Sequence, residues 1–237
     1  MKNLLLLFAL LLTGAARLAQ AQDNAQVRTV PKFTAIRVSS GIELTLTGGS
    51  AQRVVVSAST PELRDRIQTT VGNDGVLTLR VEPQPNEGWR SWGRQQKLQV
   101  AVTAEGLTAL MASSGSSVQT SGAFAAPTSF QLDVSSGATV NAELKTATLA
   151  SRVSSGSTLS LRGQAESLDV QVSSGASFNG GELQTNRCQA QASSGASARV
   201  AVRQSLTASA SSGGSITYRG QPQVTKSTSS GGSVSGG

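Results

Sequence analysis

The tripeptide Ser-Ser-Gly occurs eight times in this chain of 237 residues, and its spacing constrains the fold more than any other feature. From the second copy onward, successive glycines are 22, 19, 19, 20, 18 and 18 residues apart. A nearly fixed period of this length is typical of solenoids, in which each repeat forms one coil and buries its apolar side chains against the next. The glycines are Gly41, Gly115, Gly137, Gly156, Gly175, Gly195, Gly213 and Gly231.

Apolar residues occupy every second position on both sides of the motif. Around Gly137, for example, Val134 and Val140 are apolar whereas Gln131 and Asp133 are polar. Alternation with a period of two is typical of half-buried strands. Each unit is therefore expected to form a strand, the Ser-Ser-Gly bend, a second strand and a turn. The sequence predicts an all-β fold, a parallel β-helix with about one coil per Ser-Ser-Gly repeat, right-handed by general precedent.

The same alternation predicts that the second Ser of each motif and the residue after the Gly both point inward. The residue after the Gly is small from the second motif on, as in Ser116, Ala138 and Ser157, which indicates a narrow coil. Inward Ser hydroxyls are then expected to hydrogen-bond along the coil axis. The alternative is that the Ser columns form an exposed surface that binds ice or a glycan. Asp133 and Arg152 occupy the same outward column on adjacent repeats and are expected to pair weakly.

Two inward positions carry unusual residues. Cys188, the only cysteine, lies in an apolar column and is expected to be a core residue, so no disulfide forms within the chain. Lys226 stands where earlier repeats have Leu132 or Val170. A charged inward residue predicts that the last coil is a polar cap that discourages end-to-end stacking. The alternative is that this coil is a docking edge for a second copy.

The first residues have the features of a secretory signal peptide. Lys2 precedes an apolar run over residues 4–12, and Ala19-Gln20-Ala21 is a typical cleavage site. The run is too short to span a bilayer, and no later segment is apolar enough to do so. Cleavage after Ala21 predicts an exported protein, located in the periplasm, on the outer surface or in the medium. Residues 22–29 are expected to be a short tail and residues 30–237 a single solenoid domain.

Within that domain, residues 30–106 are expected to form less regular N-terminal coils and residues 107–237 the regular repeats. Residues 33–47 have the composition of a first complete unit. Strands are predicted over residues 53–58, 76–81 and 97–103. Thr60 followed by Pro61 predicts a helical turn over residues 61–67, with Thr60 as the N-cap.

The order of these weak motifs resembles the head GIN domain family, a bacterial family described as autotransporter adhesins. The matching features are Phe33 through Ile42, Val54-Val55-Val56, Leu63 with Ile67, Gly75-Val76-Leu77-Thr78-Leu79, residues 100–103, and residues 107–110 running into Ser113-Ser114-Gly115. The resemblance covers about residues 30–235. It implies an exported, β-helical, surface-associated protein, and it supplies no catalytic residues.

The residue types point away from catalysis. The chain has no His, which removes the commonest general base and metal ligand, and its acidic residues form no recognisable catalytic pair or calcium loop. The sequence therefore predicts a non-enzymatic protein with no cofactor and no metal. Loss of Lys2 and Arg17 would leave a formal net charge of +5, scattered rather than clustered, which makes nucleic acid an unsuitable partner. An adhesin-like or scaffold module that binds a cell-surface glycan or protein is expected; the alternative is a polysaccharide-processing β-helix lyase or hydrolase.

One segment, residues 83–96, interrupts the strand pattern. It contains both tryptophans of the chain, and its ligand-binding candidates are Trp89, Arg90, Trp92 and Arg94. Indole rings stack on sugars, and guanidinium groups bind carboxylates or phosphates. The alternative is that the loop folds back and its tryptophans pack on the solenoid. The sequence names neither the ligand nor the oligomeric state.

Overall fold

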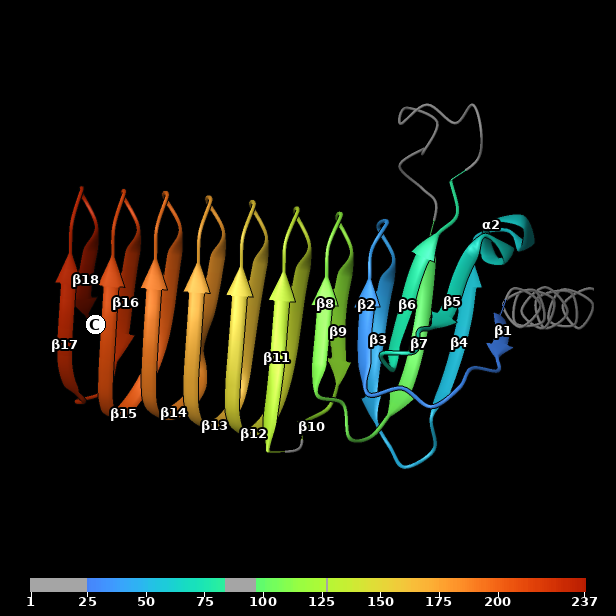
Figure 1. Cartoon of the computed structure of the whole chain (residues 1–237), viewed down its shortest axis with the longest axis horizontal. Coiled ribbons are helices and arrows are strands. Elements are labelled where there is room, and N and C mark those ends of the chain that lie inside the picture. Colours follow the sequence, from blue (N-terminus) through green and yellow to red (C-terminus); the bar gives the residue numbers. More distant parts are fainter. Residues whose placement is uncertain (1–24, 84–96, 127) are drawn as a thin grey trace, which may run out of the picture.

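The structure is a computed structural model, and it describes residues 25–83, 97–126 and 128–237. Strands stack along one axis into a flattened solenoid, and tight turns line up along its upper edge in Figure 1. The strands that precede these turns form one sheet, here the front sheet, and those that follow form the back sheet. This arrangement confirms the predicted parallel β-helix.

The regular coils extend from β8 to β18. Four long strands, β12 to β15, each run through the back sheet of one coil, around the lower bend and into the front sheet of the next. All pairings between these coils are parallel. The strands are β8 (Ala109–Ala112), β9 (Ser117–Ser121), β10 (Phe124–Ala125), β11 (Ser129–Val134), β12 (Thr139–Val153), β13 (Thr158–Val172), β14 (Ser177–Ala192), β15 (Ser197–Ala210), β16 (Ser215–Arg219), β17 (Gln223–Thr228) and β18 (Ser233–Gly236).

Each Ser-Ser-Gly motif forms the tight turn between the two sheets. The second Ser has a φ of 47° to 63° and the Gly a φ of 67° to 75°, so both central residues are left-handed, as in a type I′ turn. The amide of the residue after the Gly donates to the carbonyl of the first Ser, for example from Ala138 to Ser135 at 3.1 Å. The motifs stack in one column, as the sequence predicted.

The predicted inward position of the second Ser is wrong. Ser136, for example, is exposed, whereas the next residue but one, Ala138, is fully buried. Strand alternation does not continue through a turn whose two central residues have positive φ, because both project away from the coil. The inward hydroxyls belong instead to the residue after the Gly. Ser157 donates to the carbonyl of Val134 in the preceding coil at 2.9 Å.

The first unit lies next to the second, although 74 residues separate their glycines. Its strands, β2 (Ala35–Val38) and β3 (Glu43–Gly48), pair in parallel with β8 and β9 on one side and with β6 (Val76–Val81) and β7 (Leu98–Ala104) on the other. β6 and β7 therefore have the positions that the strands before and after Ser-Ser-Gly have in the other coils. The intervening segment builds the N-terminal end before the chain returns to stack the second coil.

This N-terminal end differs from the less regular coils that the sequence predicted. Its outer strands run antiparallel to their neighbours: β4 (Arg53–Ala58) pairs with β7, β5 (Ile67–Val71) with β6, and β1 (Ala25–Arg28) with β4. Residues 25–28 lie within the expected tail but form this edge strand. The predicted helical turn is confirmed as α2 (Pro61–Asp65), in which the Thr60 hydroxyl caps the amide of Leu63.

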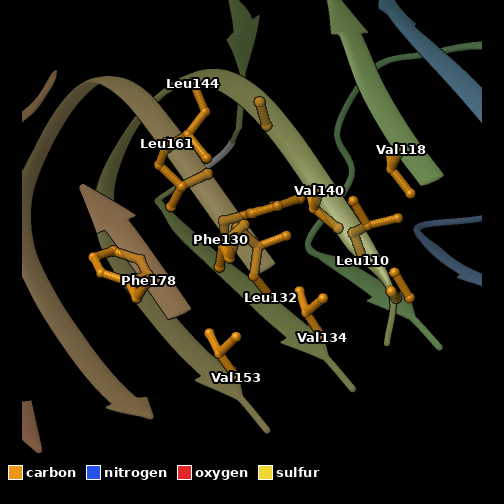
Figure 2. Packing of buried hydrophobic residues seen from close by; sticks show 14 of the residues in the cluster. Leu110, Val118, Phe130, Leu132, Val134, Val140, Leu144, Val153, Leu161 and Phe178 are labelled. Carbon is orange, nitrogen blue, oxygen red and sulfur yellow. The ribbon is translucent and has the colours of Figure 1, made fainter. Parts of the chain in front are cut away.

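The core is a continuous row of apolar side chains between the two sheets. Figure 2 shows Leu132, Val134 and Val153 beside Val140 and Phe178, with side chains of both sheets interdigitating. Each residue stacks on its equivalent in the next coil, such as Leu149 on Leu168 and Leu168 on Cys188. Burial of these rows along the whole solenoid removes enough apolar surface from water to stabilise coils that could not fold singly.

Candidate ligand-binding face

The sequence-predicted candidates Trp89, Arg90, Trp92 and Arg94 lie outside the described residues. The strands that flank them are β6 in the front sheet and β7 in the back sheet, next to the N-terminal end. The described residues that could form a binding site therefore lie on the outer faces of the coils.

A hollow of about 160 Å³ opens on the back sheet at an irregularity in the strand pairing. The register between β13 and β14 shifts between Ser160 and Arg162, where β14 carries an additional glycine. Such bulges redirect side chains and often adjoin functional sites. The polar residues that line the hollow are Asn141, Ser160, Arg162, Asn179 and Glu182.

Neighbouring hollows share residues with this one. Asn179 also lines a hollow of about 160 Å³ with Ser197, Arg199 and Thr217. Glu182 also lines one of about 260 Å³ at the lower bend. We call this connected surface, which crosses β12 to β16, the back groove. Its polar residues are Asn141, Ser160, Arg162, Ser177, Asn179, Glu182, Gln184, Ser197, Arg199, Arg203, Ser215, Thr217 and Arg219.

Ion pairs between coils border the back groove. The Nε atom of Arg162 lies 3.7 Å from a carboxylate oxygen of Glu143, and a guanidinium nitrogen of Arg187 lies 3.2 Å from Glu166. The amide of Asn186 also donates to Glu166 at 2.6 Å. These groups are about half exposed, so each pair contributes little to stability, on the order of 0.2–1 kcal/mol.

The front sheet is flat and polar. The predicted pair between Asp133 and Arg152 is present, with 3.9 Å between a carboxylate oxygen and a guanidinium nitrogen on paired positions of β11 and β12. Gln131 donates to Asp133 at 2.7 Å. Outward amides and hydroxyls continue along the coils, as in Gln171, Gln191 and Ser209.

The sequence reasoning did not identify the back groove, although part of its signal was present. The position four residues after the Gly of each motif carries a polar residue and faces outward. Successive coils have Gln119, Asn141, Ser160, Asn179 and Arg199 at this position. The hollow itself depends on the register shift at Gly180 and Gly181, which repeat spacing does not reveal.

The described residues contain no group of His, Cys, Asp and Glu side chains placed to hold a metal ion. The described part of the chain also has no helix that is long and apolar enough to cross a membrane. The single cysteine, Cys188, is buried, as the sequence predicted, and burial raises the pKa of its thiol to about 12. The groove itself presents hydrogen-bonding and charged groups.

Solved structures of bacterial proteins share this fold. A protein described as a putative adhesin from Bacteroides fragilis NCTC 9343 aligns with a TM-score of 0.76 at 16% identity, covering 90% of this chain and 94% of that chain. A putative adhesin from Parabacteroides distasonis ATCC 8503 aligns with a TM-score of 0.71 at 17% identity, covering 90% and 96%. A protein from the same organism described as a putative lipid binding protein aligns with a TM-score of 0.60 at 16% identity, covering 90% and 97%.

No curated protein matches the chain by sequence. A family model does match, over residues 32–222, which include the first Ser-Ser-Gly unit, the antiparallel N-terminal end and the regular coils through β16. The chain therefore belongs to the family described as "Putative auto-transporter adhesin, head GIN domain".

Proposed function

We propose that this protein is an exported module of the cell envelope or cell surface that binds a glycan without transforming it. The observation that carries this proposal is the back groove, in which amide, hydroxyl and charged side chains from successive coils face solvent side by side. Sugars present many hydroxyl groups, and a surface with both donors and acceptors at regular spacing suits them. Membership in an adhesin family agrees with a binding role.

A polar ligand fits this surface better than an apolar protein partner. Within the described residues, the large apolar side chains that are well exposed are Val27 and Val224, which lie near opposite ends of the solenoid. Protein interfaces depend on a few buried aromatic or apolar anchors, and the described faces offer none as a contiguous patch.

The polysaccharide-processing alternative depends on paired carboxylates. Glu143 and Glu182 lie on coils to either side of Arg162, which places their backbones about 10 Å apart by strand spacing. Glycosidases need their two carboxyl groups about 5 Å apart when retaining and about 6.5–9.5 Å apart when inverting, with both groups free to act on the scissile bond. Here a guanidinium occupies the intermediate register position and pairs with Glu143, which favours binding over hydrolysis.

A glycan array combined with a reducing-sugar assay on the same panel tests this function. We expect binding without release of reducing ends. Asn179→Ala with Ser197→Ala, two uncharged groups that line one hollow of the groove, should weaken binding, whereas Gln171→Ala with Gln191→Ala, on the front sheet, should not. Turnover of any bound glycan would establish the enzymatic alternative, and equal effects of both variant pairs would place the binding site elsewhere.

Export is proposed from the signal peptide of residues 1–21, which lie outside the described residues. Expression in a bacterial host should yield a mature chain that begins at Gln22, detected by N-terminal sequencing, and Ala19→Asp with Ala21→Asp should leave the precursor uncleaved. A full-length chain in the extracellular or periplasmic fraction would contradict the proposed cleavage site.

A further inference from the structure

All charged side chains in the last coils are basic. After Glu182 the chain has no acidic residue, although it continues for three more Ser-Ser-Gly motifs. Arg187 is paired with Glu166 at 3.2 Å, so its charge is balanced locally. The remaining basic residues of this part are Arg199, Arg203, Arg219 and Lys226.

Three of these side chains gather on one part of the back groove. Arg199 lies on β15, paired with Thr217 on β16, and Arg219 follows Thr217 by two residues on the same outward face. Strand spacing places the backbones of Arg199 and Arg219 about 8 Å apart. Arg203 and Arg219 together line the hollow of about 260 Å³ at the lower bend. We call Arg199, Arg203 and Arg219 the arginine cluster.

The positive charge of the cluster is not balanced by the protein around it. Within the described residues, Arg199 and Arg219 make no ion pair or side-chain hydrogen bond, and Arg203 donates to the neutral amide of Gln184. Glu182 is the one carboxylate among the lining residues of the hollow that holds Arg203 and Arg219. Three like charges at this spacing repel one another, and a bound anion would relieve the repulsion.

We propose that the arginine cluster binds the acidic groups of a glycan, namely the carboxylates of uronic acids or the sulfates of a sulfated polysaccharide. Guanidinium groups form paired hydrogen bonds with such oxyanions. The adjoining hollow supplies Ser177, Ser197, Ser215 and Thr217 for the sugar hydroxyls. This inference rests on the proposed glycan-binding function and specifies the chemical class of its ligand.

Other polyanions fit this surface less well. A membrane-binding surface places apolar side chains beside its basic ones, and the described residues around the cluster expose no large apolar side chain. Binding of single-stranded nucleic acid uses exposed aromatic rings for stacking, whereas Tyr218, the aromatic residue nearest the cluster in sequence, is partly buried against the core.

The test compares two charge-matched double variants of the full mature chain. Arg199→Gln with Arg219→Gln removes two charges from the cluster. Arg37→Gln with Arg80→Gln removes two charges from the front sheet. Arg37 on β2 pairs with Thr78 on β6, and Arg80 lies two residues after Thr78. The backbones of Arg37 and Arg80 therefore have the same offset as those of Arg199 and Arg219. Binding is measured by calorimetry against sodium polygalacturonate, heparin, neutral dextran and vesicles of phosphatidylglycerol with phosphatidylcholine. Thermal melts establish that both variants fold.

We expect wild-type binding to polygalacturonate or heparin, weakening as salt rises, because charge pairs at an exposed surface are screened. The cluster variant should bind at least tenfold more weakly and the control variant within about twofold of wild type. Equal losses in both variants would show dependence on net charge alone and overturn the inference. Preferential binding to the vesicles would also overturn it. Binding of dextran alone, unchanged in the cluster variant, would overturn the inference while preserving the proposed function, and binding of no glycan would defeat both.

Discussion

Gly163 of β13 lies against the carbonyl oxygen of Leu144 in the preceding coil, and a Cβ atom at Gly163 would stand 2.1 Å from that oxygen. The φ of Gly163 is +112°, which residues with a side chain rarely adopt. A side chain at position 163 would therefore clash with Leu144 and also adopt an unfavourable backbone conformation. We expect Gly163→Ala to lower the free energy of unfolding by roughly 3 kcal/mol, measured by urea titration.

Gly156, in the Ser-Ser-Gly turn of the same coil, is the matched control. Its φ is +68°, but no atom lies within 4 Å of a Cβ built there. Gly156→Ala should cost only the conformational penalty, about 1 kcal/mol. A loss as large as that of Gly163→Ala would mean that backbone conformation, rather than the close approach to Leu144, determines the effect.

Two buried serines on either side of the Gly156 turn should respond to substitution with opposite signs. The Ser151 hydroxyl has no hydrogen-bond partner, although the residue is 2% exposed and stacks between Leu132 and Val170. Ser151→Val should raise the free energy of unfolding by about 1 kcal/mol, because it removes an unsatisfied polar group and adds apolar surface. Differential scanning calorimetry would show a higher Tm.

Ser157, in contrast, donates at 2.9 Å to Val134 and at 2.7 Å to Ser154. Ser157→Ala should lower the free energy of unfolding by about 1 kcal/mol, because buried carbonyl groups lose a donor. Stabilisation by this substitution would show that the hydroxyl is retained for a reason other than these hydrogen bonds.

The repeat made much of the fold predictable. Odd positions around Gly137 and Gly175 are apolar because they line the interior, so Val134, Val140 and Phe178 could be assigned to the core from spacing alone. Thr60 and Pro61 define the start of α2 through capping chemistry that is local in sequence. The pairing of Asp133 with Arg152 followed from their equivalent positions in adjacent coils.

The remaining features depend on information that periodicity does not contain. The predicted position of Ser136 was wrong because positive φ at two consecutive turn residues interrupts the alternation and turns both residues outward. The antiparallel pairing of β4 and β5 depends on how the segment after the first coil turns back. The back groove depends on a register shift near Gly180, and the arginine cluster on which outward residues the coils bring together.

The Cys188 thiol should be unreactive in the folded protein. Burial, with a smaller contribution from the charge of Asp169, raises its pKa from 9.0 to about 12. The thiolate is the nucleophile, so iodoacetamide should label Cys188 at pH 8 only after denaturation. Rapid labelling of the native chain would show that the surrounding coils open.

The same pKa shift makes stability depend on pH in the alkaline range. A folded-state pKa above the unfolded value gives stability that is fully present below about pH 9 and is lost as the pH rises toward 12. Cys188→Ala should therefore show a smaller decline of urea midpoint between these pH values than wild type. Identical declines would assign the alkaline loss to other groups.

The tryptophans of the 83–96 segment provide a test of the sequence-based ligand site. If Trp89 and Trp92 stack on a sugar, Trp89→Ala with Trp92→Ala should weaken glycan binding at least tenfold with an unchanged Tm. A large fall in Tm with binding retained would instead identify them as packing residues. Arg90→Gln with Arg94→Gln separates the contribution of charge from that of the rings.

Lys226 is expected to control association through the last coil of the described solenoid. It pairs with Ala208 and so continues the inward column of Leu132 and Val170, but every residue of β17 is exposed. Within the described residues, β17 pairs with β15 on one side only. An open strand edge invites pairing with another chain, and a charge in the inward row opposes it because stacking would bury that charge. Wild-type chains should therefore remain separate at this end.

Lys226→Val should restore the apolar column and allow two open ends to associate. Light scattering across a concentration series should then show dimers or larger assemblies for Lys226→Val but not for wild type. Lys145→Val is the control, because Lys145 is also exposed but lies on β12, which is paired on both sides. Association of Lys145→Val to the same degree would attribute the effect to added surface hydrophobicity. Wild-type assemblies that form through the β17 edge would show that the terminal coil is a docking edge and that Lys226 does not cap it.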